Sequence, residues 1–234
     1  MKIRLLFLAI FIIIILSILL SLFIVPFIKA QYTDFIIDCS HRNHSKSSVV
    51  KNSQYKNFDA TGKILFIGDS IVEFGIWDEL IPNQKILNRG AGSEATIDIL
   101  DKIEMLTDSN PESVIIMAGI NDFSQKCSSA ETFINYKKIV ENFLKDQKKV
   151  YIVSTLLCSP FYEKNCTDKL DRITRLNNHL YEYAHDNKNL IFIDSNSVMS
   201  ESGVLIKNYT NDGIHLNSNG YKVLAKKIQE SISK

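Results

Sequence analysis

Lys63-Ile64-Leu65-Phe66-Ile67-Gly68-Asp69-Ser70 is the stretch of sequence that decides the fold. Its apolar run is typical of a strand buried on both faces of a parallel sheet, and the glycine that closes it predicts a sharp turn. Residues 113–118 repeat the pattern, and a glycine and the pair Asn121-Asp122 follow shortly after. Because ligands bind outside the carboxyl ends of strands in open α/β sheets, Ser70 and this pair are expected at one shared rim.

Apolar strands and helical segments alternate along the rest of the chain. We expect strands at 63–67, 85–88, 113–118, 149–154 and 190–194, and helices near 94–107, 130–146, 168–186 and 217–232. This alternation predicts an α/β fold, a three-layer α/β/α sandwich with a central, mostly parallel sheet of the flavodoxin-like kind. We assign residues 61–234 to this domain and residues 31–60 to a polar linker.

Two further segments, Asn88-Arg89-Gly90-Ala91-Gly92-Ser93 and Asp212-Gly213-Ile214-His215, carry groups suited to catalysis. An imidazole with an ordinary pKa of about 6.5 can take the proton of a serine hydroxyl at neutral pH. A carboxylate on the other ring nitrogen fixes the tautomer and stabilises the imidazolium. Because Asp212 precedes His215 by one short turn, both can lie on one face, and the fold must then bring Ser70 to them.

These four segments, in this order, closely resemble the SGNH hydrolase family, whose members are also called GDSL-type esterases and lipases. The resemblance covers roughly Lys63 to the end of the chain. It implies that Ser70 is the nucleophile, His215 the general base and Asp212 the third member of the triad. It also implies three donors to an oxyanion: the backbone N–H of the serine, a backbone N–H of the second segment, and the side chain of Asn121.

The second segment departs from the family pattern. Where many members have Gly-Gly-Asp or Ser-Gly-Asp, this chain has Gly92-Ser93-Glu94, which places Ser93 at the position of the donor glycine. A backbone N–H survives this change, but a turn that needs a positive φ is strained by serine. Gly90 or Gly92 supplies the donor instead if the loop is shifted.

Each segment also has a purely structural interpretation. Ser70 suits the N-cap of a following helix, Asp212 and His215 suit a surface turn, and Asn121 suits a turn after a strand. The occurrence of all four together favours an enzyme. Because the other histidines lack ligand spacing with cysteine or carboxylate partners, we interpret them as surface residues and expect no metal or other cofactor. These histidines are His41, His44, His179 and His185.

The N-terminal segment is apolar and uncharged from Leu5 to Ile28. As a helix it would rise about 36 Å, which exceeds the hydrocarbon core of about 30 Å. Lys2 and Arg4 precede it, which favours a cytoplasmic N-terminus with the rest of the chain outside. We therefore expect a signal anchor or transmembrane helix over residues 1–30, with the catalytic domain in the periplasm or at the cell surface. The alternative is a cleaved signal peptide and a secreted protein.

The charge and the cysteines of the chain indicate which partners and which cellular compartment to expect. The chain has 27 basic and 26 acidic residues, and without a clustered basic surface we expect no nucleic-acid partner. Exported cysteines can form disulfides. Cys158 and Cys166 flank a short loop and are the first choice for a bridge. A link from Cys127 into that loop is the rival, and free buried thiols remain an alternative for Cys39 and Cys127.

The sequence thus predicts a membrane-anchored, extracytoplasmic serine ester hydrolase that cleaves carboxylic esters, including O-acetyl esters, through an acyl-serine intermediate on Ser70. The expected substrate is a small-molecule, lipid or glycan ester. We favour a small acyl group, because no long additional apolar loop follows the N-terminal segment. Two alternatives remain open: an envelope glycan O-acyltransferase, and a catalytically silent binding domain of the same fold, for which the serine at position 93 is the support.

Overall fold

The structure is a computed structural model of the chain, and it describes Leu22, residues 45–57 and residues 62–233. The chain divides into two compact units, Met1–Ile37 and Asp38–Lys234, and every element named below belongs to the second. In the described part of the chain, no helix is both long and apolar enough to cross a membrane. The expected transmembrane segment, residues 1–30, lies outside the described residues except for Leu22.

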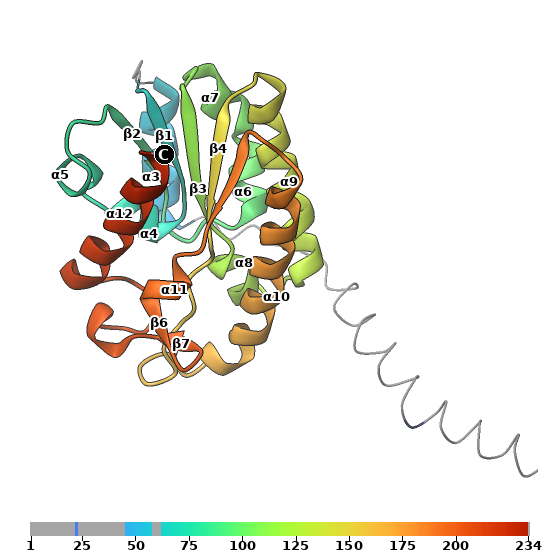
Figure 1. Ribbon diagram of the computed structural model, residues 1–234, viewed down its shortest axis with the longest axis vertical. Helices are drawn as coiled ribbons and strands as arrows, with labels where there is room; N and C mark the ends of the chain where they lie inside the picture. The colour runs from blue at the N-terminus through green and yellow to red at the C-terminus, as the bar shows by residue number, and fades with distance from the viewer. Residues whose placement is uncertain (1–21, 23–44, 58–61, 234) are drawn as a thin grey trace, which may run out of the picture. The chain divides into compact units, whose positions relative to one another are not determined.

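A parallel, five-stranded sheet forms the centre of the second unit, with the strand order β2-β1-β3-β4-β5 (Figure 1). Its strands are β1 (Ile64–Gly68), β2 (Ile86–Gly90), β3 (Ser113–Met117), β4 (Lys149–Val153) and β5 (Leu190–Ile193). This is the flavodoxin-like order. The central strands are buried on both faces, as their continuous apolar runs predict. The expected α/β fold with a central parallel sheet is confirmed.

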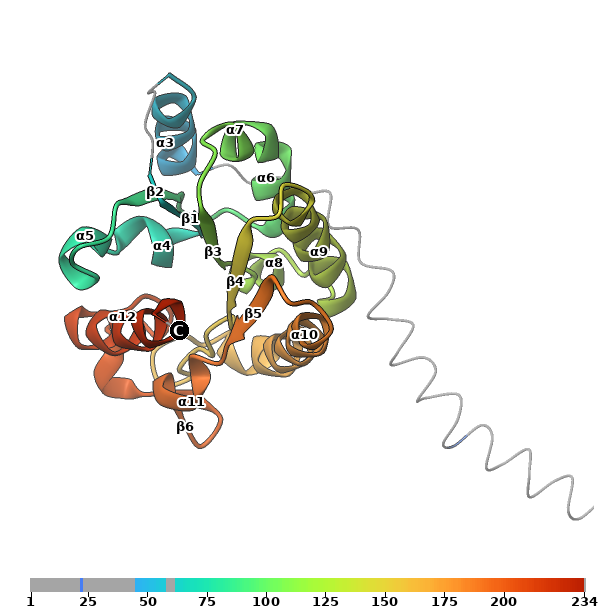
Figure 2. The same cartoon turned by 45° about the horizontal axis from the view of Figure 1, so that its top comes forward.

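Helices cover both faces of this sheet, as Figure 2 shows. One core cluster joins one face to α6–α10, and a second joins the opposite face to α4, α5, α11 and α12. The helices of the first layer are α6 (Thr96–Asp101), α7 (Ile103–Asp108), α8 (Ile120–Ser124), α9 (Ser129–Lys145) and α10 (Cys166–His185). Those of the second are α4 (Ser70–Phe74), α5 (Trp77–Leu80), α11 (Asn196–Met199) and α12 (Ser218–Ile232). A hairpin of β6 (Ser200–Glu201) and β7 (Val204–Leu205) and a 3-10 turn, η2 (Lys207–Tyr209), lead into α12.

Helix α3 (Lys46–Asn57) lies within the segment that the sequence assigned to a polar linker. Its sequence has no apolar stripe, and Ser48 is its buried residue, so hydrophobic periodicity could not reveal it. The helix expected over 94–107 is also interrupted, because α6 ends and α7 begins around Lys102.

The three cysteines that the structure describes are disulfide-bonded. Cys158 and Cys166 form the expected disulfide. Cys127 is also disulfide-bonded, so its interpretation as a free thiol is wrong.

Candidate active site

Ser70 lies where β1 turns into α4. Asp69 is the N-cap of α4, and its carboxylate accepts a hydrogen bond from the backbone N–H of Ile71 at 2.9 Å. The cap role proposed for Ser70 therefore belongs to its neighbour. Glycine is required at position 68, because a Cβ there would lie 2.0 Å from the carbonyl oxygen of Met117 on β3. This tight strand-to-helix turn presents the serine hydroxyl at the carboxyl end of the sheet.

The fold brings the three expected triad residues together. Ser70 Oγ lies 2.9 Å from His215 Nε2, although the two residues are 145 positions apart in the chain. His215 Nδ1 lies 2.6 Å from Asp212 Oδ2. Because the carboxylate occupies Nδ1, that nitrogen carries the proton and Nε2 is left to accept one from the serine.

The turn from Thr210 to His215 fixes the imidazole. Asp212 Oδ1 accepts hydrogen bonds from the backbone N–H groups of Ile214 at 2.9 Å and His215 at 2.7 Å. Thr210 Oγ1 donates to the carbonyl oxygen of His215 at 2.7 Å. Burial alone would raise the pKa of Asp212, but the hydrogen bonds from the His215 ring and from the two backbone N–H groups outweigh it and lower the pKa. The carboxylate is therefore ionised beside the imidazole at neutral pH.

The disulfide loop supports this turn from the outside. Ser159, next to the Cys158–Cys166 bridge, donates its backbone N–H to the carbonyl oxygen of Gly213 at 2.8 Å. Gly213 has a φ of +91°, and a Cβ there would lie 2.7 Å from the Ser159 carbonyl oxygen. Glycine at this position therefore permits both the turn and the close approach of the loop.

In the second segment, the structure separates the candidate donors. Gly90 donates its N–H to Asn88 Oδ1 at 2.9 Å, and Gly92 donates its N–H to Glu73 Oε2 at 2.7 Å. The N–H of Ser93 has no hydrogen-bond partner among the described residues. Ser93 has a φ of +66°, so it occupies the left-handed region that favours glycine. The unshifted assignment, Ser93, is thus the candidate donor of this loop.

Asn121 lies against the same loop. Its side-chain Nδ2 donates to the carbonyl oxygen of Glu94 at 3.0 Å, and an amide nitrogen carries a second hydrogen that remains for a ligand. The neighbouring carboxylate, Asp122, is fully buried and accepts hydrogen bonds from the backbone N–H and the hydroxyl of Thr96 at the start of α6. Burial raises the pKa of Asp122 to about 6. Asn121 thus contacts the candidate oxyanion loop, whereas Asp122 holds the start of α6 through its hydrogen bonds to Thr96.

Glu94 is a buried residue of the site that the sequence did not single out. Its carboxylate contacts Lys102 Nζ at 2.6 Å and accepts hydrogen bonds from Asn52 Nδ2 at 2.7 Å and Ser48 Oγ at 3.1 Å. Helix α3 is thereby joined to the loop that carries Ser93. Two more hydrogen bonds join the same segments, from Ser45 Oγ to the Gly92 carbonyl and from Tyr55 Oη to the Gly90 carbonyl. A third, from Ser47 Oγ to Glu73, joins α3 to α4. The sequence signal that could have identified Glu94 was its difference from the family pattern, which has Asp at this position.

The two other histidines that the structure describes do not join the site. His179 and His185 are exposed on α10, and His41 and His44 lie outside the described residues. In the described part of the chain, no group of three or more His, Cys, Asp or Glu side chains is arranged to hold a metal ion.

Most of the chain matches a known protein family. Residues 66–223 match the GDSL-like lipase/acylhydrolase family. The chain belongs to this family. Its fold agrees with that of an acylhydrolase-like structure from Bacteroides fragilis NCTC 9343, which is 26% identical, with a TM-score of 0.70 over 82% of this chain and 98% of that one.

Two curated relatives of this chain are named for different enzymatic activities. It is 29% identical to an N-acylneuraminate cytidylyltransferase of Escherichia coli O18:K1:H7 over 77% of this chain, but the match spans only 43% of that protein's length. It is 26% identical to an isoamyl acetate-hydrolyzing esterase 1 homolog of Mus musculus, over 69% of this chain and 78% of that protein.

Proposed function

We propose that this chain is a serine ester hydrolase that works through an acyl-serine intermediate on Ser70. The observation that carries the proposal is the continuous series of contacts from Ser70 Oγ through His215 to Asp212, at 2.9 and 2.6 Å. His215 takes the serine proton as Oγ attacks the ester carbonyl, and it then donates that proton to the departing alcohol. A water molecule, activated by the same imidazole, releases the acid and restores the serine.

The oxyanion formed in each step meets donors from three places. These are the backbone N–H groups of Ser70 and Ser93, which have no hydrogen-bond partner among the described residues, and the second amide hydrogen of Asn121. Donors that wait in place for developing charge supply a large share of the rate, and losing one costs on the order of 100- to 1,000-fold.

We propose a carboxylic ester with a small acyl group as the substrate, including O-acetyl esters. The name of the mouse relative, an isoamyl acetate-hydrolyzing esterase homolog, supports an acetyl ester as the substrate. The name of the bacterial cytidylyltransferase adds no substrate, because more than half of that protein lies outside the match.

We further propose that residues 1–30 anchor the enzyme in a membrane with the catalytic domain outside the cytoplasm. The uncharged run from Leu5 to Ile28, preceded by Lys2 and Arg4, supports this. Membrane fractionation followed by N-terminal sequencing tests it: an anchored chain is recovered in the membrane fraction and still begins at Met1. A soluble form that begins near Gln31 would instead establish a cleaved signal peptide.

The test of the proposed activity is covalent labelling of the full-length chain, in detergent, with a fluorophosphonate probe, together with hydrolysis of p-nitrophenyl acetate. We expect labelling at Ser70, and loss of both labelling and turnover in Ser70→Ala. Ser233→Ala, which removes an exposed hydroxyl near the end of the chain, is the matched control and should behave as the unaltered protein. Turnover in Ser70→Ala equal to that of the control would contradict the nucleophile assignment.

A further inference from the structure

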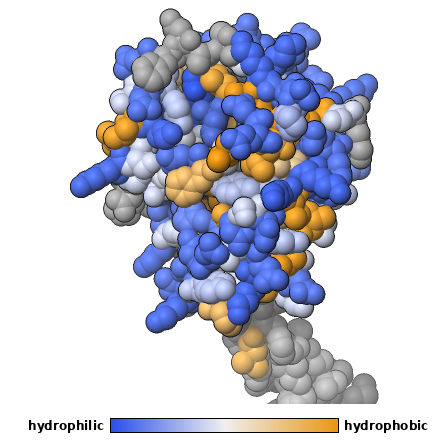
Figure 3. All heavy atoms as spheres, turned by 90° about the vertical axis from the view of Figure 1, so that its left-hand side faces the viewer, coloured by the Kyte–Doolittle hydropathy of each residue, from blue (hydrophilic) through white to orange (hydrophobic). Residues whose placement is uncertain are grey.

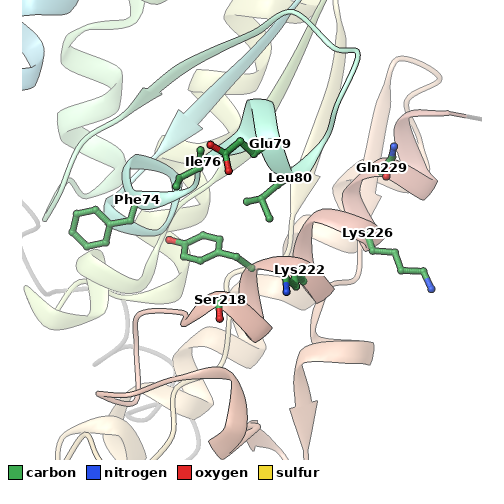
Figure 4. A pocket seen from close by; sticks show the side chains of 9 residues that line it. Phe74, Ile76, Glu79, Leu80, Ser218, Lys222, Lys226 and Gln229 are labelled. Atoms are coloured by element: carbon green, nitrogen blue, oxygen red, sulfur yellow. The ribbon is translucent and has the colours of Figure 1, made fainter.

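A pocket of about 410 Å³ lies between the α4–α5 segment and α12 (Figure 4). Phe74, Ile76 and Leu80 line it from one side, and α12 lines it from the other with Tyr221 and Lys222. The surrounding face is mostly hydrophilic, with apolar surface gathered around its middle (Figure 3). The volume falls within the range of about 300 to 1,000 Å³ that is usual for small-molecule sites.

Phe74 connects this pocket to the candidate triad. It lies one helical turn after Ser70 on α4, and its ring faces the imidazole of His215 with the ring centroids 5.5 Å apart. Phe74 is therefore shared by the pocket lining and by the surroundings of the His215 imidazole. Ser93 and Asn121, the candidate oxyanion donors, belong to other segments, β2–α6 and α8.

This position identifies which part of an ester the pocket can receive. In acylation, a bond forms between Ser70 Oγ and the carbonyl carbon, and the bond from that carbon to the alkoxy oxygen breaks. The alkoxy oxygen takes its proton from His215 Nε2, so the alcohol part of the substrate must lie beside the imidazole. The pocket wall nearest the imidazole is Phe74.

The walls select for an apolar group. Phe74 and Ile76 are 54% and 62% exposed, although both are large and apolar. The hydroxyl of Tyr221 donates to the carbonyl oxygen of Ile71 at 2.7 Å, so its ring rather than its polar end faces the pocket. Lys226 extends away from the pocket in Figure 4. An alcohol that carries alkyl or aryl carbon gains contact with the apolar side chains here, although Glu79, Ser218 and Gln229 also line the pocket.

We propose that this pocket binds the apolar alcohol portion of the ester and makes the enzyme selective for its leaving group. The inference rests on the proposed function and adds to it the class of alcohol. After acylation the alcohol has left, and the acetyl-serine is the same whatever ester produced it. Selectivity should therefore appear in acylation and be absent from deacylation.

The first experiment holds the acyl group constant. The full-length enzyme is given methyl, propyl, butyl and hexyl acetates, and kcat/KM is measured for each. Burial of each added methylene is worth about fourfold, so we expect kcat/KM to rise several-fold per step until the pocket is filled. The rate of deacylation, from single-turnover measurements, should be the same for all four esters.

Variants then locate the selectivity. Phe74→Ala removes one wall of the pocket, and Ser218→Trp fills the pocket from α12. Each should reduce the hexyl-to-methyl ratio of kcat/KM by about tenfold or more. Tyr181→Ala, which removes an exposed aromatic ring on α10, is the control and should preserve the ratio. In a parallel series of p-nitrophenyl esters with growing acyl chains, the dependence on acyl length should be the same in all variants.

The outcomes are distinguishable. Ester turnover with equal kcat/KM along the alcohol series would overturn this inference and leave the proposed function in place. A change in acyl-length dependence in Phe74→Ala would assign the pocket to the acyl group and would also overturn it. Absence of turnover with every ester, together with absence of fluorophosphonate labelling, would overturn the proposed function and this inference with it.

Discussion

The two halves of the candidate site are held in different ways. In the proton-transfer half, Asp212 and His215 are fixed by hydrogen bonds within one turn that begins at Thr210. In the oxyanion half, Ser93 and Asn121 depend on partners that are distant in sequence, since Glu94 joins their loop to Asn52 on α3 and to Lys102. The first half is held mainly by contacts within this turn, with one backbone hydrogen bond from Ser159 to Gly213, whereas the second half is assembled from several elements.

This difference predicts different responses to substitution. A change in the local half should remove a chemical function and leave the rest of the molecule unaltered. A change in the assembled half should shift the position of a donor, and its effect should be shared among several residues.

The largest effect is expected from Asp212→Asn in the local half. The amide can present its N–H to the imidazole and favour the wrong tautomer, in which Nε2 can no longer accept the serine proton. We expect kcat for p-nitrophenyl acetate to fall on the order of 1,000-fold, with an unchanged circular dichroism spectrum because Asp212 is exposed. A fall of less than tenfold would show that His215 does not need this carboxylate.

Asn121→Ala should have the next largest effect, in the assembled half. Because its amide is proposed to donate to charge that develops in the transition state, the loss should appear in kcat rather than KM, at on the order of 100-fold. Asp122→Ala is the neighbouring control: it removes the acceptor for Thr96 and should mainly reduce the free energy of unfolding. Near-normal kcat in folded Asn121→Ala would mean that the donors lie elsewhere.

The contrast also explains what the sequence could predict. The strands are continuous apolar runs closed by glycine, and the Asp212–His215 turn lies within four residues, so both can be recognised from adjacent residues. Helix α3 has no apolar stripe, and its contacts with the loop at Gly90 and Glu94 join positions more than 30 residues apart. Polar contacts of this kind leave no periodic pattern in the sequence.

Ser93 lies between these two cases. The resemblance placed it at the donor-glycine position and predicted strain there, and the structure gives it a φ of +66°. The sequence could not choose between Ser93 and the two nearby glycines, because that choice depends on which N–H groups are already engaged. Gly90 is engaged by its near neighbour Asn88, whereas Gly92 is engaged by Glu73, which is 19 positions away in the chain.

Asn52→Ala should show whether α3 positions the oxyanion loop. The substitution removes the hydrogen bond to Glu94 and the acceptor for Lys102. We expect kcat to fall about tenfold or less with little change in KM, and the effect to shrink when Asn121 is already alanine, because both act on one loop. Asn57→Ala, which removes a bond to the carbonyl of Ser53 within the same helix, is the matched control. Equal effects of Asn52→Ala in both backgrounds would contradict the coupling.

At Asp69, which lies beside Ser70, the expected effect is on stability and its pH dependence rather than on kcat. Burial raises its pKa to about 7; the hydrogen bond from Ile71 and the charge on His215 oppose the rise, and the charges on Asp122 and Glu94 add to it. The folded protein therefore retains a proton that the unfolded chain releases near pH 4. The stabilisation from this proton is complete below about pH 4 and is lost as pH rises to about 7, by at most about 1.4 kcal/mol per pH unit.

Asp69→Asn isolates this contribution, because the amide does not titrate and its oxygen can still accept the N–H of Ile71. Urea midpoints measured at pH 5, 6, 7 and 8 should decline with pH in the unaltered protein and decline less steeply in the variant. A residual slope is expected between pH 5 and 6, because Asp122 has its own raised pKa of about 6. The lowered pKa of Asp212 affects stability only at more acidic pH, outside the range from pH 5 to pH 8.

Asp146→Asn, which removes an exposed carboxylate at the end of α9, is the control and should keep the slope of the unaltered protein. The same slope in Asp69→Asn would mean that Asp69 is ionised in the folded state, and that its carboxylate is stabilised by the proton-transfer half more strongly than burial disfavours it.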